Sequence, residues 1–98
     1  MKLVYADFMK NDYENRLVLT CLGTLKDLEK HNIELETGLR LVFYNEDEDS
    51  NGVKDDLVVE GIVEYDKKNE RWVATIDWDK IKNISQLSLE EKQKLGVE

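Results

Sequence analysis

Residues 57–78 read "LVVEGIVEYDKKNERWVATIDW", which is two runs of β-branched and aromatic residues separated by a polar turn. This composition on both sides of a turn predicts a β-hairpin. When Tyr65 is placed opposite Glu70, the apolar side chains of both runs fall on the same face of the hairpin. Trp72 and Trp78 lie on that face, and we expect them to be core residues.

A second hairpin is predicted at the start of the chain. The runs "KLVYADFMK" (2–10) and "RLVLTCL" (16–22) are also rich in strand-forming residues, and they flank the turn cluster "NDYEN". With Met9 opposite Arg16, the apolar residues of the two runs form one continuous surface. This pairing predicts that Cys21 is buried in the core.

Two short helices are indicated by their capping residues. Thr24 and Asp27 have the spacing of a capping box, and Asn32 is suited to the left-handed position that ends a helix. In the tail, Ser88 begins the same pattern before "LEEKQKL". This pattern predicts a short C-terminal helix at about 89–95.

The number and spacing of these elements predict the fold class. A further strand with alternating apolar residues is expected at 39–44, which makes five strands and two short helices in 98 residues. We therefore predict a single small domain, residues 1–98, of the mainly β (β-rich α+β) class. The expected architecture is a strongly bent antiparallel sheet or a partly closed barrel, because closure removes exposed strand edges. In shape alone, such a sheet resembles the SH3-like and OB-type barrels.

The charge of the chain restricts its partners. Its 22 acidic and 14 basic residues give a formal net charge of -8, which repels phosphate backbones and anionic lipid surfaces. We therefore expect neither direct nucleic-acid binding nor membrane association. The lone Cys21 cannot form an internal disulfide, and no long apolar run is present. These features favour a cytoplasmic protein.

The acidic loop, residues 46–56, is the strongest candidate for a metal site. It holds six carboxylates and one lysine, and from Asp47 onward it matches the first half of an EF-hand calcium loop. The bidentate glutamate of such a loop is replaced by Val58, and the flanking segments are predicted strands. The alternative is a solvated turn, since Asp, Asn, Ser and Gly are common turn residues. The candidate calcium ligands are Asp47, Asp49, Asn51 and Asp55.

No motif for catalysis or for a resident cofactor is found in the chain, apart from the calcium candidate. We therefore expect a non-enzymatic protein-interaction module, which binds a protein partner or forms a homo-oligomer. Apolar residues on the second face of the sheet need a cover, and the expected contact residues are Tyr44, Ile62 and Val73, together with the acidic loop. Two alternatives remain open, namely a calcium-binding module and an immunity or nucleic-acid-mimic protein that neutralises a basic partner.

Overall fold

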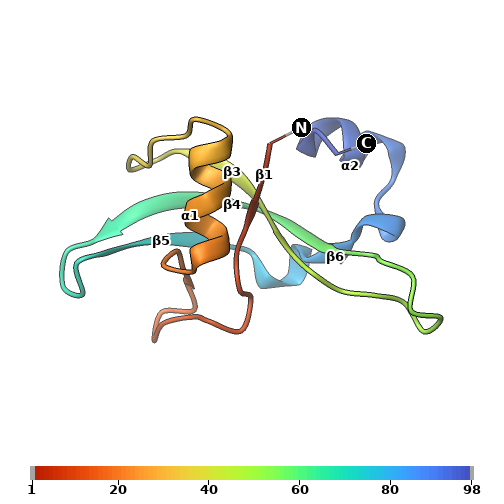
Figure 1. The fold of residues 1–98 in the computed structure, drawn as a ribbon, viewed down its shortest axis with the longest axis horizontal. Helices are drawn as coiled ribbons and strands as arrows, with labels where there is room; N and C mark the ends of the chain where they lie inside the picture. The colour runs from red at the N-terminus through yellow and green to blue at the C-terminus, as the bar shows by residue number, and fades with distance from the viewer. Residues whose placement is uncertain (1, 98) are drawn as a thin grey trace.

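The structure, a computed structural model that describes residues 2–97, is a six-stranded mixed sheet with two α-helices (Figure 1). The strands follow the order β1-β3-β4-β5-β2, and β6 pairs with the first residues of β4. The strand-rich class with two short helices is thus confirmed, with six strands instead of five. The elements are β1 (Leu3–Tyr5), β2 (Leu17–Val18), α1 (Leu22–Lys30), β3 (Arg40–Asn45), β4 (Leu57–Asp66), β5 (Arg71–Ile76), the 3-10 turn η1 (Trp78–Lys80), β6 (Lys82–Asn83), the 3-10 turn η2 (Ile84–Gln86) and α2 (Leu89–Leu95).

The N-terminal segment corrects the predicted topology. Strand β1 runs parallel to β3, with Leu3 opposite Val42, so the sheet is not antiparallel throughout. The predicted first hairpin forms only next to its turn, where Asn11 bridges Leu17. Beyond that point β1 and β2 go to opposite edges of the sheet. The sheet is not closed, so the structure does not confirm a barrel.

The apolar residues of the two N-terminal segments still contribute to the core although these segments pair with other strands than predicted. Both segments face the same side of the sheet. The main core lies between one face of the sheet and α1, and Trp72 and Trp78 pack against it while remaining partly exposed. Cys21 is also partly exposed, so its predicted place in the core is wrong. The buried members of this core are Val4, Ala6, Phe8, Leu17, Leu19, Leu28, Leu41, Phe43, Val59, Val63, Ala74 and Ile76.

The β4–β5 hairpin forms, but its register differs from the predicted one by two residues. Tyr65 lies opposite Trp72, and Asp66 closes the ladder opposite Arg71. The reason is the turn, which consists of residues 67–70 and has Glu70 in the left-handed region at φ 52°. A shift by two residues keeps every side chain on its predicted face, because the strand period is two.

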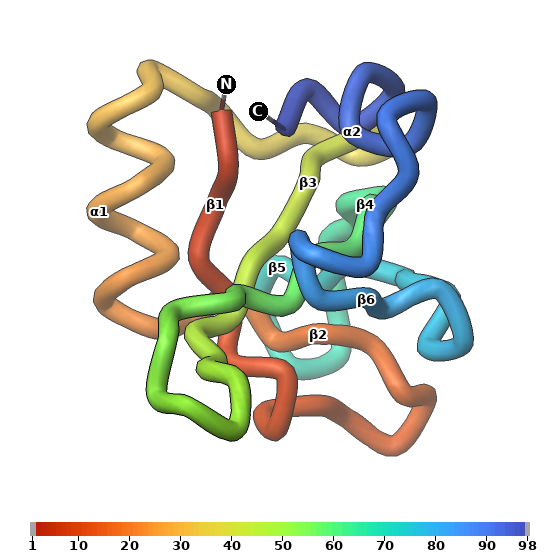
Figure 2. Tube along the Cα trace, turned by 90° about the vertical axis from the view of Figure 1, so that its right-hand side faces the viewer, coloured from red at the N-terminus to blue at the C-terminus, as the bar shows by residue number. Residues whose placement is uncertain are grey.

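Helix α1 covers the outer edge of β1 in a way that differs from the predicted capping box (Figures 1 and 2). The helix begins at Leu22, so Thr24 lies inside it and is fully buried. The Thr24 hydroxyl donates to the Tyr5 carbonyl at 2.6 Å, and the Asp27 carboxylate accepts from the Tyr5 N–H at 2.9 Å. The two side chains thus satisfy the backbone groups of an edge strand.

Helix α2 covers part of the second face of the sheet. Its predicted capping box is present, since Ser88 and Glu91 each accept a hydrogen bond from the other's backbone N–H at 3.0 Å. The helix ends at Gly96, whose φ is 73°. Around it, Leu87 and Val97 pack on Val58 and form a second, smaller core.

The acid stability of the protein is expected to depend in part on Glu91. Hydrogen bonds from the Ser88 backbone and the Lys82 ammonium lower the pKa of Glu91 to about 2, from the usual 4.5. A carboxyl whose pKa is lower in the folded state stabilises that state above its unfolded pKa and stops doing so as the pH falls through its folded pKa. Urea unfolding at a series of pH values should therefore show the difference between the wild type and Glu91→Gln shrinking from about pH 4.5 to about pH 2.

The neighbouring Glu90 provides the control for this titration. It is exposed in the same first turn and has no side-chain hydrogen bond among the described residues. Glu90→Gln removes a carboxylate from the same turn without removing a hydrogen bond, so a pH dependence found only with Glu91→Gln is due to the contacts of Glu91. A difference between wild type and Glu91→Gln that stays constant over that pH range would contradict the assignment.

Candidate functional site

The acidic loop is a regular extension of the β3–β4 pair. Beyond the last ladder positions, Asp55 N–H donates to the Asp47 carbonyl and Asp49 N–H to the Val53 carbonyl, both at 2.9 Å, and Glu48 bridges Lys54. Residues 46–56, called the acidic hairpin below, project from one end of the long axis of the molecule (Figure 1). The carboxylates are therefore displayed on an ordered β-structure.

The tip of the acidic hairpin is fixed by Asp49. One of its carboxylate oxygens accepts hydrogen bonds from Asn51 N–H at 2.8 Å and from Val53 N–H at 3.0 Å. Gly52 follows with a φ of 78°, where a side chain would be strained. The turn predicted for this stretch is therefore present, and the Asp49 carboxylate stabilises it through these two hydrogen bonds.

The root of the acidic hairpin is attached to the segment after β5. The Asn83 amide donates to the Asp47 carboxylate at 2.9 Å and to the Asp55 carbonyl at 2.7 Å. The Ser85 N–H donates to the Asp55 carboxylate at 2.9 Å, and the Ser85 hydroxyl also binds that carboxylate. These hydrogen bonds from Ser85 lower the pKa of Asp55, which therefore stays ionised at neutral pH.

The four predicted calcium ligands are not assembled into a site. The carboxylates of Asp47 and Asp55 accept hydrogen bonds at the root, from Asn83 and Ser85 respectively. The Asp49 carboxylate instead accepts from the backbone of the tip. Within residues 2–97, no three His, Cys, Asp or Glu side chains are grouped so that they could hold a metal ion. Asn51 contributes its backbone N–H to the turn. The structure therefore gives the calcium hypothesis no geometric support.

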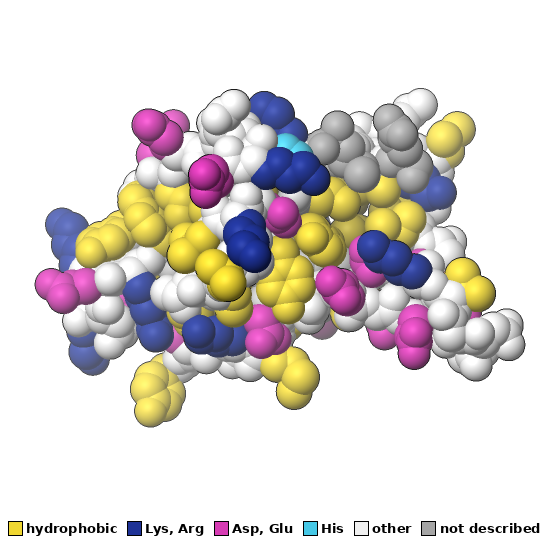
Figure 3. Space-filling model, viewed as in Figure 1, with side chains coloured by type: hydrophobic (Ala, Val, Ile, Leu, Met, Phe, Trp, Pro, Cys, Tyr) yellow, Lys and Arg dark blue, Asp and Glu magenta, His cyan; other side chains and the backbone are white. Residues whose placement is uncertain are grey.

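The remaining groups of the acidic hairpin are available to solvent. Glu46 and Glu48 are exposed, and neither side chain has a hydrogen bond or ion pair within residues 2–97. Lys54 lies 3.6 Å from the buried Asp56, so its charge is opposed locally. Val53, close to the tip, is 60 % exposed. Figure 3 shows that acidic side chains lie along this protrusion and also elsewhere on the same face.

The three predicted contact residues have different environments. Tyr44 is half-buried and lines a hollow beside the root of the acidic hairpin, with Lys54 and Asp55. Its ring packs edge-on against Tyr5 at 5.6 Å, and burial together with the nearby Asp27 carboxylate raises the pKa of its phenol. Tyr44 therefore extends the surface of the acidic hairpin onto the sheet.

The other two contact residues do not join this surface. Ile62 is 41 % exposed and lines a separate hollow with Leu87 and Leu95, next to α2. Val73 lies on the second face of the sheet, as predicted, but it is fully buried and therefore offers no exposed contact surface. Across the ladder from Val73, the Glu64 carboxylate accepts a hydrogen bond from the Arg16 guanidinium.

Comparison with known proteins gives no indication of function. No protein-family model matches the chain, and neither a curated protein nor a solved structure is significantly similar to it. Within residues 2–97, no helix is long and apolar enough to cross a membrane.

Proposed function

We propose that this protein is a non-enzymatic interaction module that presents the acidic hairpin to a partner protein with a basic surface. The observation that carries this proposal is the attachment of the root, where Asn83 and Ser85 hold Asp47 and Asp55. A segment that is already ordered in its binding conformation loses less conformational entropy when a partner binds. The root contacts thus prepare a charged protrusion for recognition.

The exposed side chains indicate how such a partner is bound. Glu46 and Glu48 attract a basic surface, and like charges on the partner would be repelled by the net charge of -8. Val53 supplies an apolar contact near the tip, and Tyr44 supplies an aromatic one at the root. A nucleic-acid-binding protein is one such partner, because a row of carboxylates can occupy the groove that binds phosphates. This is the immunity or mimic version of the same function.

The proposal is tested by cross-linking capture with charge-reversed variants. The variant Glu46→Lys/Glu48→Lys reverses only side chains without a structural hydrogen bond in residues 2–97, so we expect it to fold normally. Its matched control is Glu34→Lys/Glu36→Lys, which makes the same change in net charge at two exposed positions between α1 and β3. Captured proteins are identified by mass spectrometry from cells of the source organism.

The supporting result is a protein captured by the wild type and by the control but lost with the acidic-hairpin variant. Its capture should also weaken as salt is added, because salt screens contacts between exposed charges. If both variants capture the same proteins in the same amounts, the acidic hairpin is not the contact and the proposal fails.

A further inference from the structure

The N-terminal loop, residues 7–16, leaves the sheet at the same end as the acidic hairpin. It follows β1, which is the parallel neighbour of β3, and the acidic hairpin follows β3 (Figures 1 and 2). Ala6 N–H donates to the Tyr44 carbonyl at 3.0 Å, and Phe8 N–H donates to the side-chain carbonyl of Asn45 at 3.2 Å. The first residues of the loop are therefore tied to the strand that leads into the acidic hairpin.

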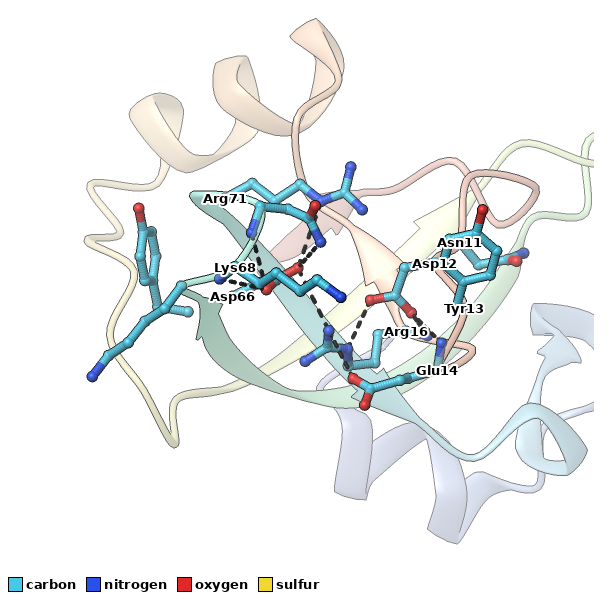
Figure 4. A pocket seen from close by; sticks show the side chains of 11 residues that line it. Asn11, Asp12, Tyr13, Glu14, Arg16, Asp66, Lys68 and Arg71 are labelled. Carbon is cyan, nitrogen blue, oxygen red and sulfur yellow. Dashed lines mark hydrogen bonds and ion pairs between the residues drawn. The ribbon is translucent and has the colours of Figure 1, made fainter.

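Two large side chains of this loop are almost fully exposed. The relative exposure is 89 % for Met9 and 106 % for Tyr13, the two highest values among the large hydrophobic residues of the described chain. In Figure 4 the Tyr13 ring takes no part in the hydrogen bonds and ion pairs drawn around it. Because they are not buried, these side chains add little hydrophobic stabilisation to the fold.

Tyr13 lies on a turn that Asp12 closes. The Asp12 carboxylate accepts from Glu14 N–H at 2.9 Å, and its carbonyl accepts from Asn15 N–H at 3.1 Å. The Arg16 guanidinium binds the second carboxylate oxygen at 2.8 Å (Figure 4). A large side chain on an ordered turn binds a partner with little loss of backbone entropy, and tyrosine is among the residue types that contribute most at protein interfaces.

Met9 is held in the same way and lies close to the charges of the acidic hairpin. The Asp7 carboxylate accepts from Met9 N–H at 2.9 Å. Burial raises the pKa of the Tyr5 phenol, and the negative charges of Asp7 and Glu46 raise it further, so both carboxylates lie near this one side chain. Tyr5 in turn packs on Tyr44, with ring centroids 5.6 Å apart. The loop therefore continues the surface formed by the acidic hairpin and Tyr44.

We infer that Met9 and Tyr13 form the apolar part of the surface that the acidic hairpin presents, so that its partner is a protein with apolar side chains beside its basic ones. This inference rests on the proposed function, since it adds to the description of the same basic partner. Negative charge attracts such a partner, and methionine and tyrosine are enriched at protein interfaces. A partner that carries only cations would leave both side chains in water.

One partner of ordinary size can contact both segments. Neighbouring strands lie about 5 Å apart, and a typical interface covers about 800 Å² of each protein. An area of that size extends well beyond two adjacent strands, so it reaches Met9 and Glu46 together.

The test uses two synthetic lysine peptides of equal length and charge as probes. One peptide has serine at its uncharged positions, and in the other some of these serines are replaced by leucine and tyrosine. Each peptide carries a fluorophore, and its dissociation constant from the full chain is measured by fluorescence anisotropy at low salt. The wild type should bind the apolar peptide about tenfold more tightly than the serine peptide, because apolar surface is buried in that complex.

Met9→Ala/Tyr13→Ala should remove this preference and leave the affinity for the serine peptide unchanged. Both side chains are exposed, so the variant should fold as the wild type does. The matched control is Leu25→Ala/Leu89→Ala, which removes two large side chains that are 50 % and 74 % exposed on the helices. This control should keep the preference for the apolar peptide.

Glu46→Lys/Glu48→Lys distinguishes failure of the inference from failure of the proposed function. It should weaken the binding of both peptides, because both are cationic. If it binds them as tightly as the wild type does, the proposed function fails and this inference fails with it. If it binds them more weakly, but the wild type has no preference or Met9→Ala/Tyr13→Ala keeps it, only the inference is overturned. Loss of the preference in the leucine control would also overturn the inference, because the effect would not be specific to the loop.

Discussion

Replacing Arg16 with alanine is expected to lower the free energy of unfolding by about 2 to 3 kcal/mol, because removal of one partner of a buried ion pair leaves the other charge buried and unpaired. The side chain of Arg16 is 15 % exposed and that of Asp12 only 5 %. Glu14 and Glu64 are much more exposed, so solvent screens their share of the network and they add little. Urea denaturation followed by tryptophan fluorescence measures this loss.

Arg40→Ala is the appropriate comparison for the Arg16 variant. It removes the same side chain and the same charge, but Arg40 is 66 % exposed and pairs with the partly exposed Glu60. Its expected cost is below about 0.5 kcal/mol. Equal losses for the two arginine variants would show that Arg16 acts only as a surface charge and does not hold the N-terminal loop against the sheet.

Replacing Gly61 with valine is expected to lower the free energy of unfolding by about 3 kcal/mol, near the upper end of what overpacking a core usually costs. A Cβ atom at position 61 would lie 2.9 Å from Ile76 Cγ2 and 2.9 Å from Phe43 Cε2. Phe43 is fully buried, so its ring cannot move out into solvent to relieve the overlap. The two γ-methyl groups of valine would increase the overlap further.

The adjacent Ile62 provides a control on the opposite face of the same strand. Because Ile62 is 41 % exposed, Ile62→Val should change the free energy of unfolding by less than about 0.5 kcal/mol. Denaturant unfolding of the two variants under identical conditions measures the difference. If Gly61→Val is as stable as the wild type, the close approach of Phe43 and Ile76 to the backbone does not constrain this position.

Sequence alternation predicted which face of a strand is buried better than it predicted which strand lies beside it. The β4–β5 hairpin illustrates this, because the register error of two residues left Val63 and Ala74 on the correct face. The two-residue error arose at the turn, where Glu70 adopts a left-handed conformation that glycine or asparagine would have indicated more clearly. Local chemistry was sufficient for α2, whose capping residue Ser88 was identified correctly.

Contacts between distant parts of the chain could not be predicted in this way. The parallel pairing of Leu3 with Val42 has no local signal, and an adjacent run of strand-forming residues offered a nearer partner. The root of the acidic hairpin depends on Asn83 and Ser85, about thirty residues away, which have no distinctive pattern of their own. The hydrogen bond from Phe8 N–H to the Asn45 side chain, which ties the N-terminal loop to β3, likewise follows only from the three-dimensional fold.

The hydrogen bonds between the backbone of Tyr5 and the side chains of Thr24 and Asp27 also affect how this protein interacts with other copies of itself. An open sheet ends in strands whose free N–H and C=O groups can pair with a strand from another molecule, and repetition of that pairing produces fibrils. At β1 the groups of Tyr5 are already occupied by a helix from the same chain. Protection against strand addition on this side therefore depends on a hydroxyl and a carboxylate one helical turn apart, and it lasts only while α1 stays docked.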